Sequence, residues 1–175
     1  MTDPSTSDRH DDDLGDSDAG ATESADVVSV ERLIPAAAGD IFALLADARR
    51  HKDIDGSGTV RDAKGDPEPL VLGSTFGMSM KMGIPYSMQS TVVEFEPDRR
   101  IAWQTRGPGP IGKYVAGRIW RYELEPTDGG TLVRESWDIT HESALTKPVV
   151  RMAADKTREN MAATLERIEQ LLAGT

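Results

Sequence analysis

The chain has 175 residues, of which 38% are hydrophobic and 29% charged, and its formal net charge is -10. This length suits one domain with its own core rather than two. Cysteine is absent, which excludes disulfides, thiol nucleophiles and thiolate-bound zinc or iron-sulfur centres in this chain. Any chemistry must therefore rest on oxygen and imidazole groups.

Residues 1–26 form an acidic segment with nine acidic residues, one base (Arg9) and little apolar content. Such a segment buries too little apolar surface to offset its ordering entropy, so we expect a disordered tail followed by one domain over 27–175. The remainder carries 21 acids and 19 bases, and we expect no nucleic-acid partner. There is neither a signal-peptide pattern nor an apolar run of about 18 residues, which predicts a cytoplasmic protein without a transmembrane segment.

The first predicted elements are a strand over 27–34, which Pro35 ends, and a helix over 40–47. In that helix Ile41, Leu45 and Ala48 recur at spacings of four and three, which places them on one face. About six strands separated by Gly, Pro and Asp turn residues are then predicted through residue 139.

A hairpin is predicted around Asp128-Gly129, a pair typical of two-residue turns. If Thr127 pairs with Gly130, one face of the hairpin is mostly apolar and the other polar. On the apolar face the expected partners are Leu124 and Val133, Tyr122 and Glu135, Trp120 and Trp137, and Arg118 and Ile139. On the polar face we expect a Glu123–Arg134 ion pair.

A single long helix is predicted from about Pro148 to the C-terminus, because proline suits the first helical turn. Its apolar stripe recurs at intervals of four and three over about 25 residues, or about 37 Å. The stripe consists of Val150, Ala154, Thr157, Met161, Leu165, Ile168 and Leu172. A helix of this length needs a broad apolar surface, which the predicted sheet provides.

This order of elements predicts an α+β domain of antiparallel strands with helices segregated to one side. Together with the motifs LADARRH (45–51), IDGSG (54–58), WRYELEP (120–126) and GGT (129–131), it resembles the START-like (SRPBCC) superfamily. The resemblance implies the helix-grip fold, in which an antiparallel β-sheet wraps around a long C-terminal α-helix; the superfamily includes polyketide cyclases, dehydrases and lipid-transport proteins. The resemblance covers about residues 27–172 and is strongest to uncharacterised actinobacterial members.

The resemblance implies a cavity between the sheet and the C-terminal helix, with no metal and no organic cofactor. The leading hypothesis is binding of a hydrophobic or amphipathic small molecule, lipid or polyketide-like, in that cavity. One alternative is a cyclase, aromatase or dehydratase-type enzyme acting on a polyketone, for which the candidate catalytic residues are Glu135, Tyr122, Arg118, His51 and Asp55. Another is a protein-interaction or regulatory module, since a superfold hosts many functions. The sequence does not fix the oligomeric state.

Residues 75–84 alternate strictly and place Phe76, Met78, Met80 and Met82 on one strand face, with Ile84. Methionine is flexible, so this row suits either an adaptable cavity wall or an ordinary core. Aromatic residues of the other strands serve equally well as pocket walls or core. The expected cavity residues are Phe76, Met78, Met80, Met82, Trp103, Trp120, Tyr122, Glu135, Trp137 and Met161.

Glu135 is the acid most suited to chemistry, because it lies on the apolar face of the hairpin between Val133 and Trp137. Burial would raise the pKa of its carboxyl group, while Tyr122 could donate a hydrogen bond to it. Either a general acid or base or a purely structural contact is consistent with this pattern. Arg118 is too far along the strand to reach Glu135 and could meet a ligand carboxylate instead.

His51 and Asp55 follow the first helix, near the cavity mouth of the resembled fold, where they could hold a polar ligand group or shape the loop. The histidines His10, His51 and His141 do not cluster, so no metal site is predicted. No Gly-x-Ser-x-Gly motif and no phosphate-binding glycine loop occur, which argues against hydrolase and nucleotide-binding functions.

Overall fold

The computed structural model describes residues 24–64, 68–82, 84–107 and 116–174. The strands are β1 (Val27–Ile34), β2 (Val60–Lys64), β3 (Thr75–Met82), β4 (Ile84–Glu96), β5 (Arg100–Arg106), β6 (Ala116–Thr127) and β7 (Gly130–Asp138). The helices are α1 (Ala38–Leu45), the short 3-10 helix η1 (Ala48–Arg50), α2 (His51–Ile54), α3 (Lys147–Arg151) and α4 (Ala154–Ala173).

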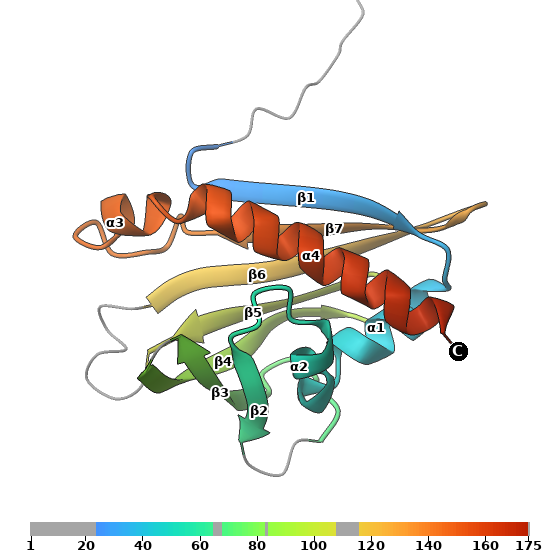
Figure 1. Ribbon diagram of the computed structural model, residues 1–175, viewed down its shortest axis with the longest axis horizontal. Coiled ribbons are helices and arrows are strands. Elements are labelled where there is room, and N and C mark those ends of the chain that lie inside the picture. The colour runs from blue at the N-terminus through green and yellow to red at the C-terminus, as the bar shows by residue number, and fades with distance from the viewer. Residues whose placement is uncertain (1–23, 65–67, 83, 108–115, 175) are drawn as a thin grey trace, which may run out of the picture.

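The strands form one antiparallel sheet of order β1-β7-β6-β5-β4-β3-β2, with α4 lying across one face (Figure 1). The smaller helices α1 and α2 follow β1 and lie beside the C-terminal half of α4. The predicted α+β helix-grip architecture is thus confirmed: β1 is followed by helices and then by the six strands β2 to β7, as the predicted first strand and run of about six strands require.

The hairpin register is also as predicted from Ile119 opposite Asp138 to the turn, whereas the expected pair Arg118 and Ile139 lies beyond the paired residues. Thr127 pairs with Gly130, Tyr122 with Glu135 and Trp120 with Trp137. The polar face differs in one side-chain contact. Arg134 lies opposite Glu123 as expected, but its guanidinium hydrogen-bonds the carboxylate of Glu31 on β1 at 2.6 Å. Strand β1 flanks β7 on the other side and places Glu31 directly opposite Arg134, so the guanidinium has a carboxylate on each neighbouring strand.

The prediction of one unbroken C-terminal helix is wrong, because α3 and α4 are separated at Met152 and Ala153. The side chains of Lys147 and Arg151 both bind Asp26, at 3.3 and 2.7 Å, which holds α3 against the start of β1. Asp26 therefore belongs to the folded domain, although it was assigned to the N-terminal tail. Residues 1–23 of that tail lie outside the described residues.

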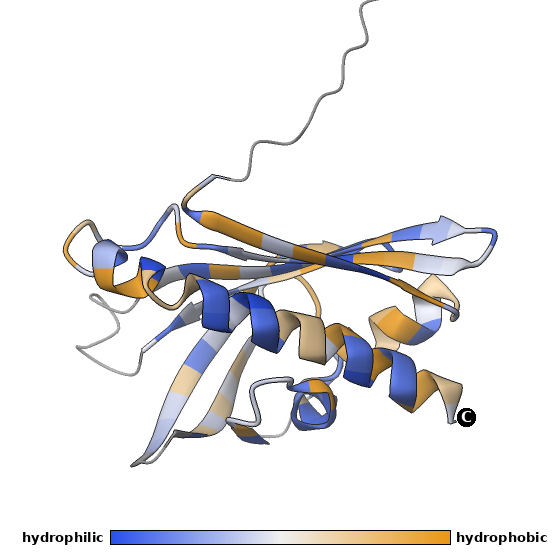
Figure 2. Ribbon diagram, turned by 45° about the horizontal axis from the view of Figure 1, so that its top comes forward, coloured by the Kyte–Doolittle hydropathy of each residue, from blue (hydrophilic) through white to orange (hydrophobic). Residues whose placement is uncertain are grey.

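The apolar stripe of α4 faces the sheet as expected, with Met161, Leu165 and Ile168 buried. Hydrophilic residues cover much of its other side (Figure 2). The main core cluster fills the space between the sheet, α1 and the C-terminal half of α4. A smaller cluster lies under the start of α4 and comprises Val28, Trp137, Ile139, Val150 and Met161. No helix in the described part of the chain is long and apolar enough to cross a membrane.

Candidate functional site

Glu135 and Tyr122 form a buried polar pair on the sheet face that α4 covers. They lie opposite each other on β7 and β6, and both are almost fully buried. The Tyr122 hydroxyl donates a hydrogen bond to Oε1 of Glu135 at 2.7 Å. The second carboxyl oxygen, Oε2, is buried and has no hydrogen-bond partner among the described residues. An unsatisfied buried oxygen costs about 1–3 kcal/mol, so this site departs from ordinary core packing.

Burial raises the pKa of Glu135 to about 8, because the surrounding core disfavours a charged carboxylate. The Tyr122 hydrogen bond opposes this shift, and the negative charge of Asp55 adds to it. Burial also raises the pKa of the Tyr122 hydroxyl well above its usual value. At neutral pH Glu135 is therefore mostly protonated, and its carboxyl group can donate as well as accept a hydrogen bond.

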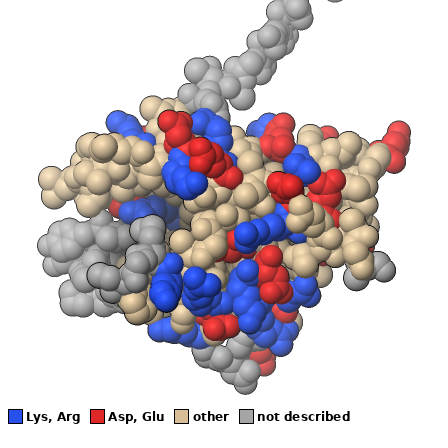
Figure 3. Space-filling view, viewed as in Figure 1, with Lys and Arg blue, Asp and Glu red and all other residues tan. Residues whose placement is uncertain are grey.

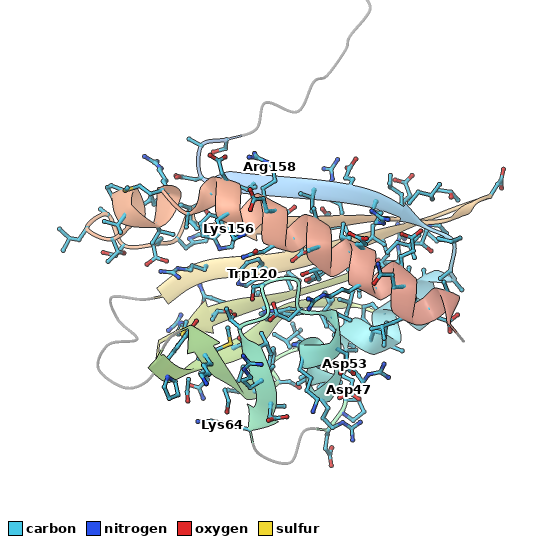
Figure 4. The ribbon with its side chains drawn as sticks, viewed as in Figure 1. Asp47, Asp53, Lys64, Trp120, Lys156 and Arg158 are labelled. Atoms are coloured by element: carbon cyan, nitrogen blue, oxygen red, sulfur yellow. The ribbon has the colours of Figure 1, made fainter. Side chains whose placement is uncertain are left out.

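Aromatic side chains from three strands surround this pair. The rings of Trp103 and Tyr122 lie 5.5 Å apart, and those of Trp120 and Trp137 lie 6.2 Å apart. Trp120 is only half-buried and projects from β6 on the side that α4 covers (Figure 4). The site thus combines one polar pair with flat apolar walls, a composition typical of small-molecule pockets.

The opposite wall is built by α4 and by the loop after α2. The backbone N–H of Gly56 donates to Oγ1 of Thr164 at 3.0 Å. A Cβ atom at position 56 would lie 2.1 Å from the carbonyl oxygen of Asn160, so only glycine allows this approach. The guanidinium of Arg167 also hydrogen-bonds the carbonyl oxygen of Asp55. These contacts fix the loop against the helix.

Asp55 shapes this loop. Its carboxylate accepts hydrogen bonds from the backbone N–H of Ser57 at 3.0 Å and of Val60 at 2.8 Å, and from the Ser57 hydroxyl at 2.6 Å. Asp55 is also near enough to raise the pKa of both Glu135 and Tyr122. Of the five catalytic candidates, the structure therefore brings these three into one electrostatic neighbourhood.

His51 lies in the core and not at a cavity mouth, which corrects the expected position. Its Nε2 is 2.9 Å from the carbonyl oxygen of Leu45, and its ring stacks on Trp103 at 4.9 Å. Burial lowers the pKa of the imidazole, so it is neutral at physiological pH. This environment gives His51 a structural position beneath the pocket wall.

Arg118 is also held by the protein itself. Its Nε lies 3.0 Å from Oε2 of Glu142, whose side chain is fully buried, and Thr146 donates to the other oxygen at 2.9 Å. The neighbouring Gly117 has a φ of +111° and packs against the carbonyl of His141. Sequence reasoning missed Glu142, because its loop carries no apolar periodicity that would signal burial.

The expected cavity residues face the interior wherever the structure describes their side chains. Phe76 and Met78 are buried and Met80 is half-buried against the core, while the side chain of Met82 lies outside the described residues. Most of these side chains belong to the two core clusters. Two grooves are open to the surface. One, of about 610 Å³, crosses β2 to β4 and includes Met80 in its lining, and the other, of about 840 Å³, is lined by residues of β1, β4, β5, β6 and β7 and of the β4–β5 turn.

Metal-binding groups do not gather in the described part of the chain, where no three His, Asp or Glu side chains come together. His51 and Asp55 are instead occupied by Leu45 and by the loop backbone. The polar groups that the buried pair offers are the carboxyl group of Glu135 and the hydroxyl of Tyr122, which can form hydrogen bonds and transfer protons.

The domain is similar to known proteins across its folded part. A 112-residue segment is 39% identical to the uncharacterised protein Rv0088 of Mycobacterium tuberculosis, covering 63% of this chain and 45% of that protein. The match thus spans less than half of the relative. Protein MLL2253 of Mesorhizobium loti has the same fold, with a TM-score of 0.65 and 19% identity over 85% of this chain and 98% of that one.

A third similar protein is the polyketide-cyclase-like Cgl2372 of Corynebacterium glutamicum, with a TM-score of 0.53 and 23% identity over 84% of this chain and 91% of that one. The family model described as polyketide cyclase / dehydrase and lipid transport matches residues 25–173. This span runs from the start of β1 to the end of α4 and includes Tyr122 and Glu135. The chain therefore belongs to the polyketide cyclase / dehydrase and lipid transport family of START-like (SRPBCC) proteins.

Proposed function

We infer that the domain binds a hydrophobic or amphipathic small molecule between the sheet and α4, and that Glu135 and Tyr122 anchor its polar group. One observation carries this proposal: Oε2 of Glu135 is buried and has no hydrogen-bond partner in the described part of the chain. A carbonyl or hydroxyl oxygen of a ligand would give the protonated carboxyl group the hydrogen bond that it lacks. The ligand class that fits is an apolar ring or chain bearing such an oxygen, as in polyketide-like compounds and lipids.

A ligand needs space that core side chains occupy. Partly exposed side chains at one side of the core support a direction from which this space can open. Along the inner face, the side chains of Met80, Tyr86 and Trp120 are partly exposed. They lie on β3, β4 and β6, toward the side where the surface is hollowed between α4 and these strands (Figure 3). Methionine changes rotamer at low cost and a half-buried indole can swing outward, so displacement of these side chains would admit a flat ligand.

Anthraquinone and anthracene test the anchor, because they share a ring system and only the first has carbonyl oxygens. Binding can be followed by quenching of the tryptophan fluorescence, as Trp103, Trp120 and Trp137 surround the pair. We expect anthraquinone to bind about tenfold more tightly, which corresponds to about 1.4 kcal/mol. The preference should vanish in Glu135→Leu and persist in Glu135→Gln, whose amide still donates.

The matched control is Glu123→Gln, because Glu123 is only partly buried and lies on the opposite face of the same strand pair. Equal affinity for both compounds in the unmodified protein would contradict the anchor. If neither anthraquinone nor anthracene binds, and fatty-acid probes do not bind either, the binding function itself is contradicted.

A second candidate function is favoured by the pKa of Glu135, which at about 8 lies close to neutral pH. A carboxyl group with such a pKa suits general acid or base catalysis, as in dehydration or aldol closure of a polyketone. For an enzyme, Glu135→Gln should abolish turnover while leaving ligand binding intact. For a carrier, the same substitution should change neither uptake nor release.

A further inference from the structure

A groove of about 610 Å³ lies at the β2 edge of the sheet, and its lining includes neither Glu135 nor Tyr122. Three strands line it, and its polar groups are cations and hydroxyls with no carboxylate. The lining residues are Arg61 and Lys64 of β2, Ser79, Met80 and Lys81 of β3, and Pro85, Tyr86 and Ser87 of β4. Such a lining favours an anionic occupant.

The groove stands out because its cations have no acidic partner among the residues that the structure describes. The described residues include 18 Lys and Arg side chains, and 13 of these have a carboxylate within 4 Å. Five have no carboxylate partner within the described part of the chain, and Arg61, Lys64 and Lys81 are three of them. Within the described part of the chain, the ammonium of Lys64 hydrogen-bonds the hydroxyl of Ser87, at 2.5 Å.

Cationic side chains also gather visibly on this part of the molecule. Lys and Arg cluster over β2 and α2 (Figure 3), and Lys64 lies at the far end of β2 (Figure 4). This concentration is unusual in a chain with a net charge of -10. Strand β2 is also the last strand of the sheet, so its outer edge is not paired with another described strand.

The same chain contains a segment of complementary charge. Residues 1–23 carry eight acidic residues against one base, Arg9, with three consecutive acids at 11–13. A segment of 23 residues reaches at most about 80 Å, at 3.3–3.6 Å per residue. A compact domain of about 150 residues has a radius of gyration near 15 Å, so this segment is long enough to reach any part of the surface.

We propose that the acidic segment of residues 1–23 binds the basic groove formed by Arg61, Lys64 and Lys81 on its own domain. The attachment at Asp26 gives the segment an effective concentration in the millimolar range, so weak ion pairs are enough to hold it there. When bound, the segment covers the free edge of β2 and neutralises the groove. The contact is electrostatic and partly exposed, so salt weakens it.

A spin label tests this contact in the full chain. Because the chain has no cysteine, Ser7→Cys gives one labelling position beside the acidic residues. We expect the nitroxide to broaden the backbone amide signals of residues 60–64 and 79–81 at low salt. The broadening should disappear at 1 M salt, where the Debye length is about 3 Å.

Two sets of substitutions identify the partners. The groove variant Arg61→Gln/Lys64→Gln/Lys81→Gln should lose the broadening, whereas Arg99→Gln/Lys156→Gln/Arg158→Gln, which removes equal charge elsewhere, should keep it. A tail variant with Asn at Asp8, Asp11, Asp12 and Asp13 should also lose it, and this change leaves the described domain untouched. Any one of three results would overturn the proposal: broadening that is confined to β1 and α3, broadening that does not change with salt, or broadening that persists in the tail variant.

The acidic segment of one chain could also bind the groove of a second copy, and this contact would broaden the same amide signals. Mixing spin-labelled chains with unlabelled, nitrogen-15-enriched chains separates the two cases. The proposal requires that the enriched chains show no broadening in this mixture. Broadening there equal to that of the labelled chain would overturn binding within one chain.

Discussion

The hydroxyl of Tyr122 hydrogen-bonds one carboxyl oxygen of Glu135 at 2.7 Å and leaves the other oxygen buried without a partner among the described residues. The arrangement follows from strand register, because the two residues lie opposite each other on β6 and β7. It makes Glu135 a neutral acid at neutral pH, surrounded by tryptophans. The proposed ligand binding and the alternative enzymatic function both depend on this pair.

Ionisation of Glu135 should lower stability as the pH rises. Its pKa is about 8 in the folded protein against 4.5 as the ordinary value, so the folded state holds more protons between these values. The stabilisation by the neutral carboxyl group is present below about pH 4.5 and is lost as the pH rises to about 8. Urea unfolding measured between pH 4.5 and pH 8 should show that the unfolding free energy falls less in Glu135→Gln than in the unmodified protein. The difference in slope should be up to about 1.4 kcal/mol per pH unit. Parallel curves would contradict the raised pKa.

His51 should act in the opposite direction. Burial lowers the pKa of its imidazole below 6.5, so the unfolded chain binds a proton that the folded state resists. This contribution to stability is present above about pH 6.5 and is lost as the pH falls below it. We expect His51→Gln to be less stable at neutral pH, yet to lose less of its unfolding free energy between pH 7 and pH 5. The control is His141→Gln, which alters an exposed histidine.

Substitution of Gly56 by alanine should be destabilising by about 1–3 kcal/mol, because the new methyl group would overlap the backbone of α4. Gly39→Ala is the matched control. Its added Cβ would meet no atom closer than 3.5 Å, and alanine favours the helix α1. Thermal unfolding should therefore show a clear loss for the first variant and no loss for the second. Equal melting temperatures would show that the loop does not pack closely on the helix.

Removal of Arg118 should leave the buried carboxylate of Glu142 without its cation. Arg118→Met should cost about 3 kcal/mol, at the low end for a buried pair because Arg118 is partly exposed. The double variant Arg118→Met/Glu142→Gln should recover part of this loss, since the amide is neutral and Thr146 can still bond it. Additive losses in a double-mutant cycle would show that the two side chains do not interact.

The sequence by itself determined the features that depend on local pattern. The alternation of residues 118–139 about Asp128-Gly129 defined the hairpin register, and therefore which side chains oppose each other, because side chains in a strand point alternately to the two faces. The three-and-four spacing of Met161, Leu165 and Ile168 likewise defined the buried face of α4. These features need only the geometry of one strand pair or one helix.

Contacts between distant segments were decided only by the tertiary structure. The break between α3 and α4 accompanies the binding of Lys147 and Arg151 to Asp26, more than 120 residues earlier in the chain. Burial of His51 against Trp103, and of Glu142 against Arg118, depends on elements whose relative positions no local spacing specifies. Whether a polar atom finds a partner depends on every element that packs around it, and so the free oxygen of Glu135 could be identified only in the folded structure.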